Sequence, residues 1–188
     1  FCAIPSTSGT ATEVTAFSII TDYNKGIKYP IADFEITPDV AIVDPDLAET
    51  MPVKLVAHTG MDALTHAIEA YTCMAANPLS DAYATGAIKK ISQNLFKVLE
   101  NPKDAEARLE LAQASTMAGI AFSNSMVGLV HSLGHALGAV AHLPHGLCMN
   151  LFLPYVLEYN KSVNGNKIAE LLLPLAGADI YSQTPADQ

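Results

Sequence analysis

The chain has 188 residues, half of them hydrophobic and 15% charged, a composition typical of a folded domain with an apolar core. Its 10 basic and 19 acidic residues give a formal net charge of −9, which argues against nucleic acid as a partner because phosphate backbones are bound by clustered Lys and Arg. No apolar run approaches the ~20 residues of a membrane-spanning helix, so we do not expect a membrane partner either.

The first 50 residues combine short β-branched runs with turn residues. Residues 18–21 and 27–31 flank a loop that contains Gly26, a pattern that predicts a β-hairpin. Residues 40–43 predict a short buried strand, which Asp44 and Pro45 would end.

From about residue 52 the pattern becomes helical, because apolar residues recur at helical spacing and strand signals nearly vanish. The expected helices cover 52–76, 79–100, 104–123, 125–141, 145–159 and 165–176. Four prolines punctuate this region, at Pro78, Pro102, Pro144 and Pro154. The sequence therefore predicts the remnant of an α/β domain over 1–50, followed by an all-α domain over 51–188.

A narrow polar stripe runs along the apolar helix expected between Thr59 and Cys73. At about 100° per residue, Asp62, His66 and Glu69 fall on one face, opposite an apolar arc. Because Asp62 and His66 are four residues apart, both side chains can reach one point above the helix. The alternative is a capping box between Thr59 and Asp62, with His66 on an ordinary solvated face.

A second polar group stands out because four of the six histidines lie between residues 131 and 145. His131 and His135 are one turn apart on a Gly-rich helix, and His142 and His145 follow. The interleaved glycines disfavour a helix but allow another backbone or a ligand to come close. This clustering favours a site over isolated core histidines.

The two polar groups together offer Asp62, His66, His131 and His145 as three imidazoles and one carboxylate. Such a ligand set suits Fe(II), Zn(II) or Mn(II), whereas an all-oxygen set would suit Mg²⁺ or Ca²⁺. Cys148, three residues after His145, is a lesser candidate for a soft ligand that would favour zinc.

The N-terminal segment 5–13 is rich in Ser and Thr, and its hydroxyls and N–H groups could cradle phosphate oxygens. The alternative is a plain capping box between Thr10 and Glu13. Neither a G-x-S-x-G nor a C-x-x-C motif occurs, so nothing supports a serine hydrolase.

The cysteines Cys2, Cys73 and Cys148 are an odd number at wide spacings, which is no disulfide framework. We expect a reducing, cytoplasmic setting, with each cysteine acting as a small buried hydrophobe.

Four sequence blocks together resemble the iron-containing alcohol dehydrogenase family. They are P-S-T-S-G-T-A-T-E at 5–13, G-M-D-A-L-T-H-A-I-E-A-Y at 60–71, G-L-V-H-S-L-G-H at 128–135 and P-H-G at 144–146. The resemblance runs from about residue 4 to about residue 177. It implies the end of a Rossmann-like dinucleotide-binding domain over 1–50 and a helical metal-binding domain over 51–188. Because the chain begins at Phe1 and lacks the family's G-G-G-S phosphate loop, we expect part of a longer protein.

The resemblance also implies residue roles. It places the catalytic metal on Asp62, His66, His131 and His145. It places the dinucleotide near Ser6, Thr7, Gly9, Thr10, Lys28 and Leu47. His135 would lie beside the metal and the nicotinamide, either as a catalytic proton relay or as support for a neighbouring ligand.

The implied function is an NAD- or NADP-linked alcohol dehydrogenase or aldehyde reductase that assembles as a homo-oligomer. Hydride would pass between a small primary alcohol and the nicotinamide, with Fe(II), or Zn(II) as the alternative, acting as a Lewis acid on the substrate oxygen. Two alternatives remain at this point: a non-catalytic metal-binding helical module, and a zinc hydrolase with Glu69 as its base.

Overall fold

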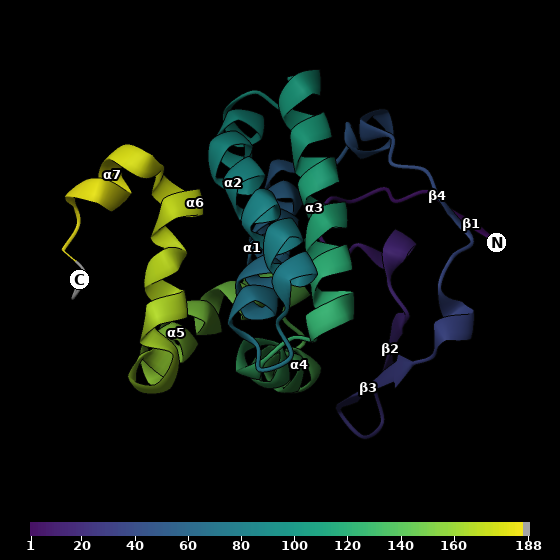
Figure 1. Cartoon of the computed structure of the whole chain (residues 1–188). Coiled ribbons are helices and arrows are strands. Elements are labelled where there is room, and N and C mark those ends of the chain that lie inside the picture. Colours follow the sequence, from purple (N-terminus) through teal and green to yellow (C-terminus); the bar gives the residue numbers. More distant parts are fainter. Residues whose placement is uncertain (186–188) are drawn as a thin grey trace.

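The computed structural model describes residues 1–185 and shows a mostly helical molecule with short strands near its N-terminus (Figure 1). The predicted fold class, a strand-containing remnant followed by a helical domain, is confirmed. The strands are β1 (Cys2–Ala3), β2 (Phe17–Asp22), β3 (Ile27–Ala32) and β4 (Val40–Ala41), with 3₁₀ turns at Thr12–Val14, Phe34–Ile36 and Pro45–Ala48. The helices are α1 (Val53–Thr72), α2 (Pro78–Glu100), α3 (Ala105–Ser125), α4 (Leu129–Ala141), α5 (His145–Glu170), α6 (Leu172–Ala176) and α7 (Ala178–Gln183).

The predicted hairpin is present, because β2 and β3 pair antiparallel in one two-stranded sheet. Its turn is held by the Asp22 carboxylate, which accepts the N–H groups of Asn24 and Lys25 at 3.0 and 3.1 Å. Gly26 follows at φ 62°, a left-handed conformation that glycine adopts without strain.

The strand predicted at 40–43 is shorter and less buried than expected. β4 covers two residues, pairs in parallel with β1, and leaves Val40 52% exposed. The prediction of a buried strand was wrong because a two-residue pair has no further layer covering it.

Local signals explain the starts of α2 and α3. Asn77 and Ser80 form a reciprocal capping box at the start of α2, where Pro78 occupies the first turn. Asp104 caps α3 by accepting the N–H of Ala107. The helix predicted at 125–141 begins four residues later than expected, at Leu129, because α3 extends to Ser125 and the chain then reverses.

Pro154 lies inside α5 without breaking it, as the helix predicted over 145–159 requires. Leu153 and Val156, on either side of this proline, are buried in the core. Their packing keeps the helix intact although proline has no backbone N–H to donate. The non-helical residue lies later, at Asn164, between the two segments predicted as 145–159 and 165–176.

Helix α1 is the centre of the molecule, packed against α2, α3 and α5 (Figure 1). Alanines with no exposed surface line these contacts and let the helices approach closely: Ala67, Ala70, Ala84, Ala87, Ala114, Ala118 and Ala121. The hairpin lies beside the helices, where β3 contacts α4. Helix α1, helix α4 and the β2–β3 hairpin therefore lie around a common region, where side chains from all three can come together.

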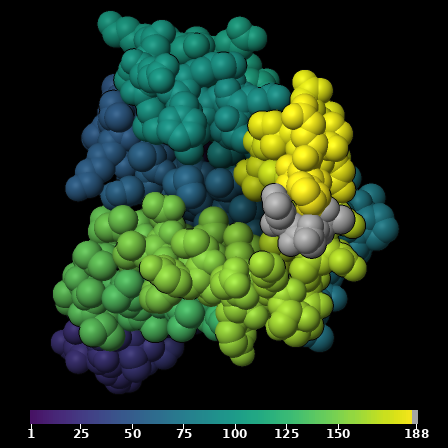
Figure 2. All heavy atoms as spheres, turned by 90° about the vertical axis from the view of Figure 1, so that its left-hand side faces the viewer, coloured from purple at the N-terminus to yellow at the C-terminus, as the bar shows by residue number. Residues whose placement is uncertain are grey.

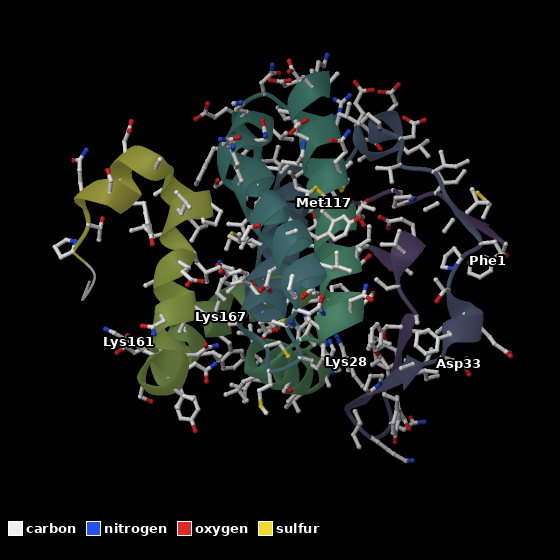
Figure 3. The ribbon with its side chains drawn as sticks, in the orientation of Figure 1. Phe1, Lys28, Asp33, Met117, Lys161 and Lys167 are labelled. Carbon is white, nitrogen blue, oxygen red and sulfur yellow. The ribbon has the colours of Figure 1, made fainter. Side chains whose placement is uncertain are left out.

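The C-terminal helices stand to one side of this bundle. Figure 2 shows the yellow residues of α6 and α7 at one edge, next to the yellow-green residues of α5. The hydroxyl of Ser92 in α2 donates to the carbonyl of Pro174 at 3.2 Å, and Lys167 of α5 donates to the carbonyl of Tyr71 at 2.9 Å (Figure 3). Among residues 1–185, no helix is both long and apolar enough to span a membrane.

Candidate metal centre

Helix α1 buries both of its predicted metal ligands. Asp62 is 2% exposed and His66 5% exposed, so the alternative of a solvated face for His66 is wrong. The alternative of a capping box is also wrong, because Thr59 lies inside α1 and its hydroxyl donates to the carbonyl of Leu55 at 3.0 Å. The narrow polar stripe therefore points into the protein.

Two further helices bring imidazoles to the same point. His131 lies in the first turn of α4, and His145 is the first residue of α5. The structure places one potential donor atom from each of Asp62, His66, His131 and His145 within 4.8 Å of the others. The tertiary structure therefore unites residues that are up to 83 positions apart in the chain.

The spacing of these donors suits a bound ion better than mutual hydrogen bonds. The Oδ1 atom of Asp62 lies 3.3 Å from His145 Nε2 and 3.7 Å from His131 Nε2. Within the described part of the chain, Asp62 Oδ1, His66 Nδ1 and His131 Nε2 are buried polar atoms without a hydrogen-bond partner. Ligands bound at about 2.1 Å around a tetrahedral ion stand about 3.4 Å apart, so these residues fit a divalent metal.

The protonation states of Asp62 and His66 also suit metal binding. Burial raises the pKa of the Asp62 carboxyl, but His66, His131 and His145 outweigh burial and hold that pKa far below its ordinary value. Burial lowers the pKa of His66 to about 3. Asp62 is therefore an anion and His66 a neutral imidazole near pH 7, the forms in which both bind metals.

Burial also lowers the pKa of His131, yet the carboxylates of Asp62 and Glu69 outweigh it and raise the pKa to about 9. Glu69, which the zinc-hydrolase alternative nominates as a base, contacts α4 instead. Both of its oxygens have partners on α4, the N–H of Val130 and the ring of His131. This arrangement leaves it badly placed to act as the base of a hydrolase.

A cavity of about 820 Å³ opens onto the four donors, between the hairpin and helices α1, α3 and α4. Of the residues that the family resemblance places near a dinucleotide, Thr10 and Lys28 line this cavity. Ser6, Thr7, Gly9 and Leu47 are not among its lining residues. Figure 3 shows Lys28 reaching from β3 toward the end of the bundle where α4 lies.

His135 also lines the cavity, one turn after His131 on α4. Its ring centre lies 5.0 Å from that of His145 and 5.9 Å from that of His131. Burial, together with His145, His131 and Lys28, lowers the pKa of His135 to about 4. Near neutral pH it is therefore an uncharged imidazole, able to accept a proton.

Other sequence candidates lie outside the cluster. His142 ends α4 at φ 54° and its ring packs beside Tyr23. The thiol of Cys148 is fully buried against Gly138, away from the four donors. Of the three cysteines expected to be buried, Cys148 is; Cys73 is half-buried and Cys2 is exposed.

Gly134 of α4 allows close packing against α5. A Cβ at Gly134 would lie 2.2 Å from the methyl carbon of Met149, so this glycine makes room for a side chain of α5.

The Ser/Thr-rich loop is not held by the predicted capping box. The 3₁₀ turn at 12–14 starts after Ala11, which has φ 52°, and Glu13 instead accepts a hydrogen bond from the Thr116 hydroxyl at 2.7 Å. This contact ties the loop to α3, and Thr10, Thr12 and Thr15 line the cavity.

Family comparisons agree along nearly the whole chain. Residues 1–45 match the model of the iron-containing alcohol dehydrogenases, and residues 56–187 match the model of the C-terminal part of the Fe-containing alcohol dehydrogenase family.

Individual relatives show the same relationship. An NADPH-dependent butanol dehydrogenase of Clostridium saccharobutylicum is 55% identical over 179 residues, which cover 94% of this chain and 46% of the relative. An NAD-dependent methanol dehydrogenase of Bacillus methanolicus is 47% identical over 173 residues, 90% of this chain and 45% of the relative. The chain thus spans about half the length of these two curated relatives.

Solved structures have the same fold. An alcohol dehydrogenase from Oenococcus oeni superposes with a TM-score of 0.93 at 34% identity, over 98% of this chain and 48% of that one. A 1,3-propanediol oxidoreductase superposes with a TM-score of 0.90 at 40% identity, over 94% of this chain and 46% of that one.

Proposed function

This chain belongs to the iron-containing alcohol dehydrogenase family, and we propose that it carries the metal centre of an NAD(P)-linked alcohol dehydrogenase or aldehyde reductase. The observation that supports this most directly is the group of Asp62, His66, His131 and His145, the first three of them buried, whose donor atoms converge at the cavity. We propose these four residues as the ligands of Fe(II), with Zn(II) as the alternative, because both metals accept this donor set.

When bound, the Fe(II) ion would supply Lewis acidity, lowering the pKa of an alcohol from about 16 toward neutrality, as zinc does for water. The chain itself supplies the surroundings. The single carboxylate of Asp62 limits the net positive charge of the site, and Phe17, Ile19 and Phe122 give the cavity apolar walls that restrict water.

We propose His135 as the residue that moves the hydroxyl proton away from the substrate. It lines the cavity beside His131 and His145, where its ring can exchange a proton with a substrate. The alternative role is to support a neighbouring ligand from the outside.

The nicotinamide of NAD or NADP is proposed to enter the same cavity, along Thr10 and Lys28. The neighbouring Ser6, Thr7 and Gly9, with Leu47, remain proposed contacts of the rest of the dinucleotide. The relatives do not favour either nucleotide, since one is named NADPH-dependent and another NAD-dependent. A small primary alcohol or its aldehyde is the proposed substrate.

The domain division also remains a proposal: residues 1–50 as the end of a dinucleotide-binding domain and 51–188 as the helical metal-binding domain. We further propose a homo-oligomer, supported by the exposed apolar side chains Tyr155, Tyr159 and Val163 on α5. A cytoplasmic setting is supported by the three unpaired cysteines.

Metal analysis and turnover after anaerobic purification test this proposal. Elemental analysis separates iron from zinc, and alcohol-dependent formation of NADH or NADPH measures activity. His131→Ala should lose both metal and activity. His142→Asn should keep both, because His142 lies outside the cluster and Asn tolerates its left-handed backbone.

A His131→Ala protein that keeps its metal and its alcohol oxidation contradicts the proposal. Metal binding without saturable binding of NADH would instead identify the non-catalytic module as the correct function.

A further inference from the structure

Glu69 joins the two helices that carry three of the four proposed ligands. It lies on α1, seven residues after Asp62, and only 5% of its surface is exposed. Its Oε1 accepts the backbone N–H of Val130 at 2.7 Å, and its Oε2 lies 2.5 Å from Nδ1 of His131. One carboxylate thus holds both the backbone and a side chain of α4.

The backbone contact replaces a missing helix cap. Helix α4 follows Gly128, which has no side chain to accept the free N–H groups of the first turn. Glu69 supplies that acceptor from the neighbouring helix. The fit is close, because a Cβ on Gly128 would lie 2.8 Å from Glu69 Oε1.

The side-chain contact determines which nitrogen of His131 carries the proton. An ionised carboxylate only accepts hydrogen bonds, so Nδ1 of His131 must be the donor. In the neutral ring, Nε2 then carries the lone pair. That nitrogen is buried without a hydrogen-bond partner among the described residues and lies 3.7 Å from Asp62 Oδ1, on the side of the cluster.

We propose that Glu69 is a positioning residue, which keeps His131 in the Nδ1–H form so that Nε2 can bind the metal. The same carboxylate fixes the distance between α4 and the helix of Asp62 and His66. This inference rests on the proposed function in so far as His131 is taken as a metal ligand.

The sharpest variant is Glu69→Gln. A glutamine can still accept the N–H of Val130, but its amide nitrogen then faces Nδ1 and donates to it. The proton of His131 moves to Nε2, the nitrogen that should bind the metal. We expect 10- to 100-fold weaker binding of Co(II), measured by the visible absorption of the protein titrated with Co(II) alone.

The tautomer itself is read by ¹⁵N NMR of the imidazole side chains, without metal, alcohol or nucleotide. At a pH above the pKa of His131, where the ring is neutral, His131 should show a proton only on Nδ1 in the parent protein and only on Nε2 in Glu69→Gln. Gly128→Ala is a second variant, which pushes the carboxylate aside while leaving every polar group in place, and it should also weaken Co(II) binding.

Glu13→Gln is the matched control. Glu13 is as buried as Glu69, but its partner is the hydroxyl of Thr116 rather than a proposed ligand. This variant should bind Co(II) as the parent does, which separates the loss of one buried charge from the loss of the contact to His131.

The inference is overturned if Glu69→Gln keeps the parent tautomer of His131, or if it binds Co(II) as tightly as Glu13→Gln does. The two proposals fail separately. If the parent protein has the Nδ1–H tautomer but does not oxidise alcohols, the proposed function is contradicted and the inference is supported. If the parent protein is active but Glu69→Gln binds Co(II) with unchanged affinity, the proposed function is supported and the inference is contradicted.

Discussion

The imidazole of His66 stacks on the phenyl ring of Phe122, with ring centres 4.4 Å apart and planes inclined by 23°. The ring of His131 covers the other face of His66, also at 4.4 Å and inclined by 18°. His66 is therefore held between two rings, one from α3 and one from α4. Because a flat ring in such a slot cannot rotate without displacing its neighbours, packing alone orients this proposed ligand.

Replacing Phe122 by alanine should therefore affect both stability and metal binding. Phe122 is buried in the main core, so Phe122→Ala should lower the free energy of unfolding by about 3–5 kcal/mol. Binding of Co(II) should weaken as well, because one side of His66 is released. Urea denaturation and Co(II) titration measure the two effects.

The control is Phe96→Ala on α2, where the ring is 71% exposed and the expected change in stability is within about 0.5 kcal/mol. If Phe122→Ala binds Co(II) as tightly as Phe96→Ala, stacking does not orient His66.

Gly146 should not tolerate a side chain. A Cβ there would lie 2.0 Å from the carbonyl oxygen of His58, a backbone atom of α1 that cannot move cheaply. Gly146→Ala should destabilise the protein by about 1–3 kcal/mol and displace the adjacent His145, weakening metal binding. Thermal unfolding and metal content provide the measurements.

Gly165 in the same helix offers the matched control. A Cβ at Gly165 meets nothing within 4 Å, so Gly165→Ala should stabilise the protein by about 0.5–1 kcal/mol. Equal melting temperatures for the two alanine variants would show that α5 does not pack on the backbone of α1 as described.

The hydroxyl of Thr116 should support the Ser/Thr-rich loop through Glu13. Thr116→Val leaves the buried carboxylate without this donor, which should cost about 1–3 kcal/mol of stability. Because the loop also brings Thr10 and Thr12 to the cavity, binding of NADH or NADPH should weaken. Urea denaturation and fluorescence titration with the nucleotide test both effects.

Thr116→Ser retains the hydroxyl and should behave nearly as the parent does. Identical nucleotide affinity in the valine and serine variants would mean that this hydrogen bond does not position the loop.

The three thiols should differ in reactivity. Burial raises the pKa of Cys148, an effect that Lys28 only partly opposes, so its thiol stays protonated near neutral pH and unreactive. Cys2 is exposed and Cys73 half-buried. In titration with a thiol reagent, Cys2 should react first and Cys148 only after denaturation. Mass spectrometry assigns each labelled site, and early labelling of Cys148 would contradict its burial.

Much of the helical domain could be predicted from residue patterns. The starts of α2 and α3 carry their own caps, Asn77 and Asp104, and the hairpin carries its turn residues, so short-range interactions are enough to specify them. A prediction failed where tertiary contacts decide the outcome: residues 40–43 do not form a buried strand, because β4 pairs over two residues and leaves Val40 exposed. Pro154 would break an isolated helix, yet the buried residues on both sides carry α5 through it.

Glu69 shows why part of the site could not be found from spacing. Its place on the polar stripe of α1 was visible, but the stripe does not say what faces it. Its partners, Val130 and His131, are more than 60 residues away, and only the packing of α4 on α1 brings them to the carboxylate.

The amino-acid sequence by itself determined the helical character of the chain, the pairing of Asp62 with His66 on one helix face, and the gathering of histidines between 131 and 145. These follow from spacing, because neighbours one turn apart on a helix must share a face. The family resemblance had already singled out His131 and His145, but only the tertiary structure brings them next to Asp62 and leaves His142 outside the cluster. Which histidines reach Asp62 depends on the angles between the helices. Close contacts of buried alanines and glycines set these angles, and no local sequence pattern encodes them.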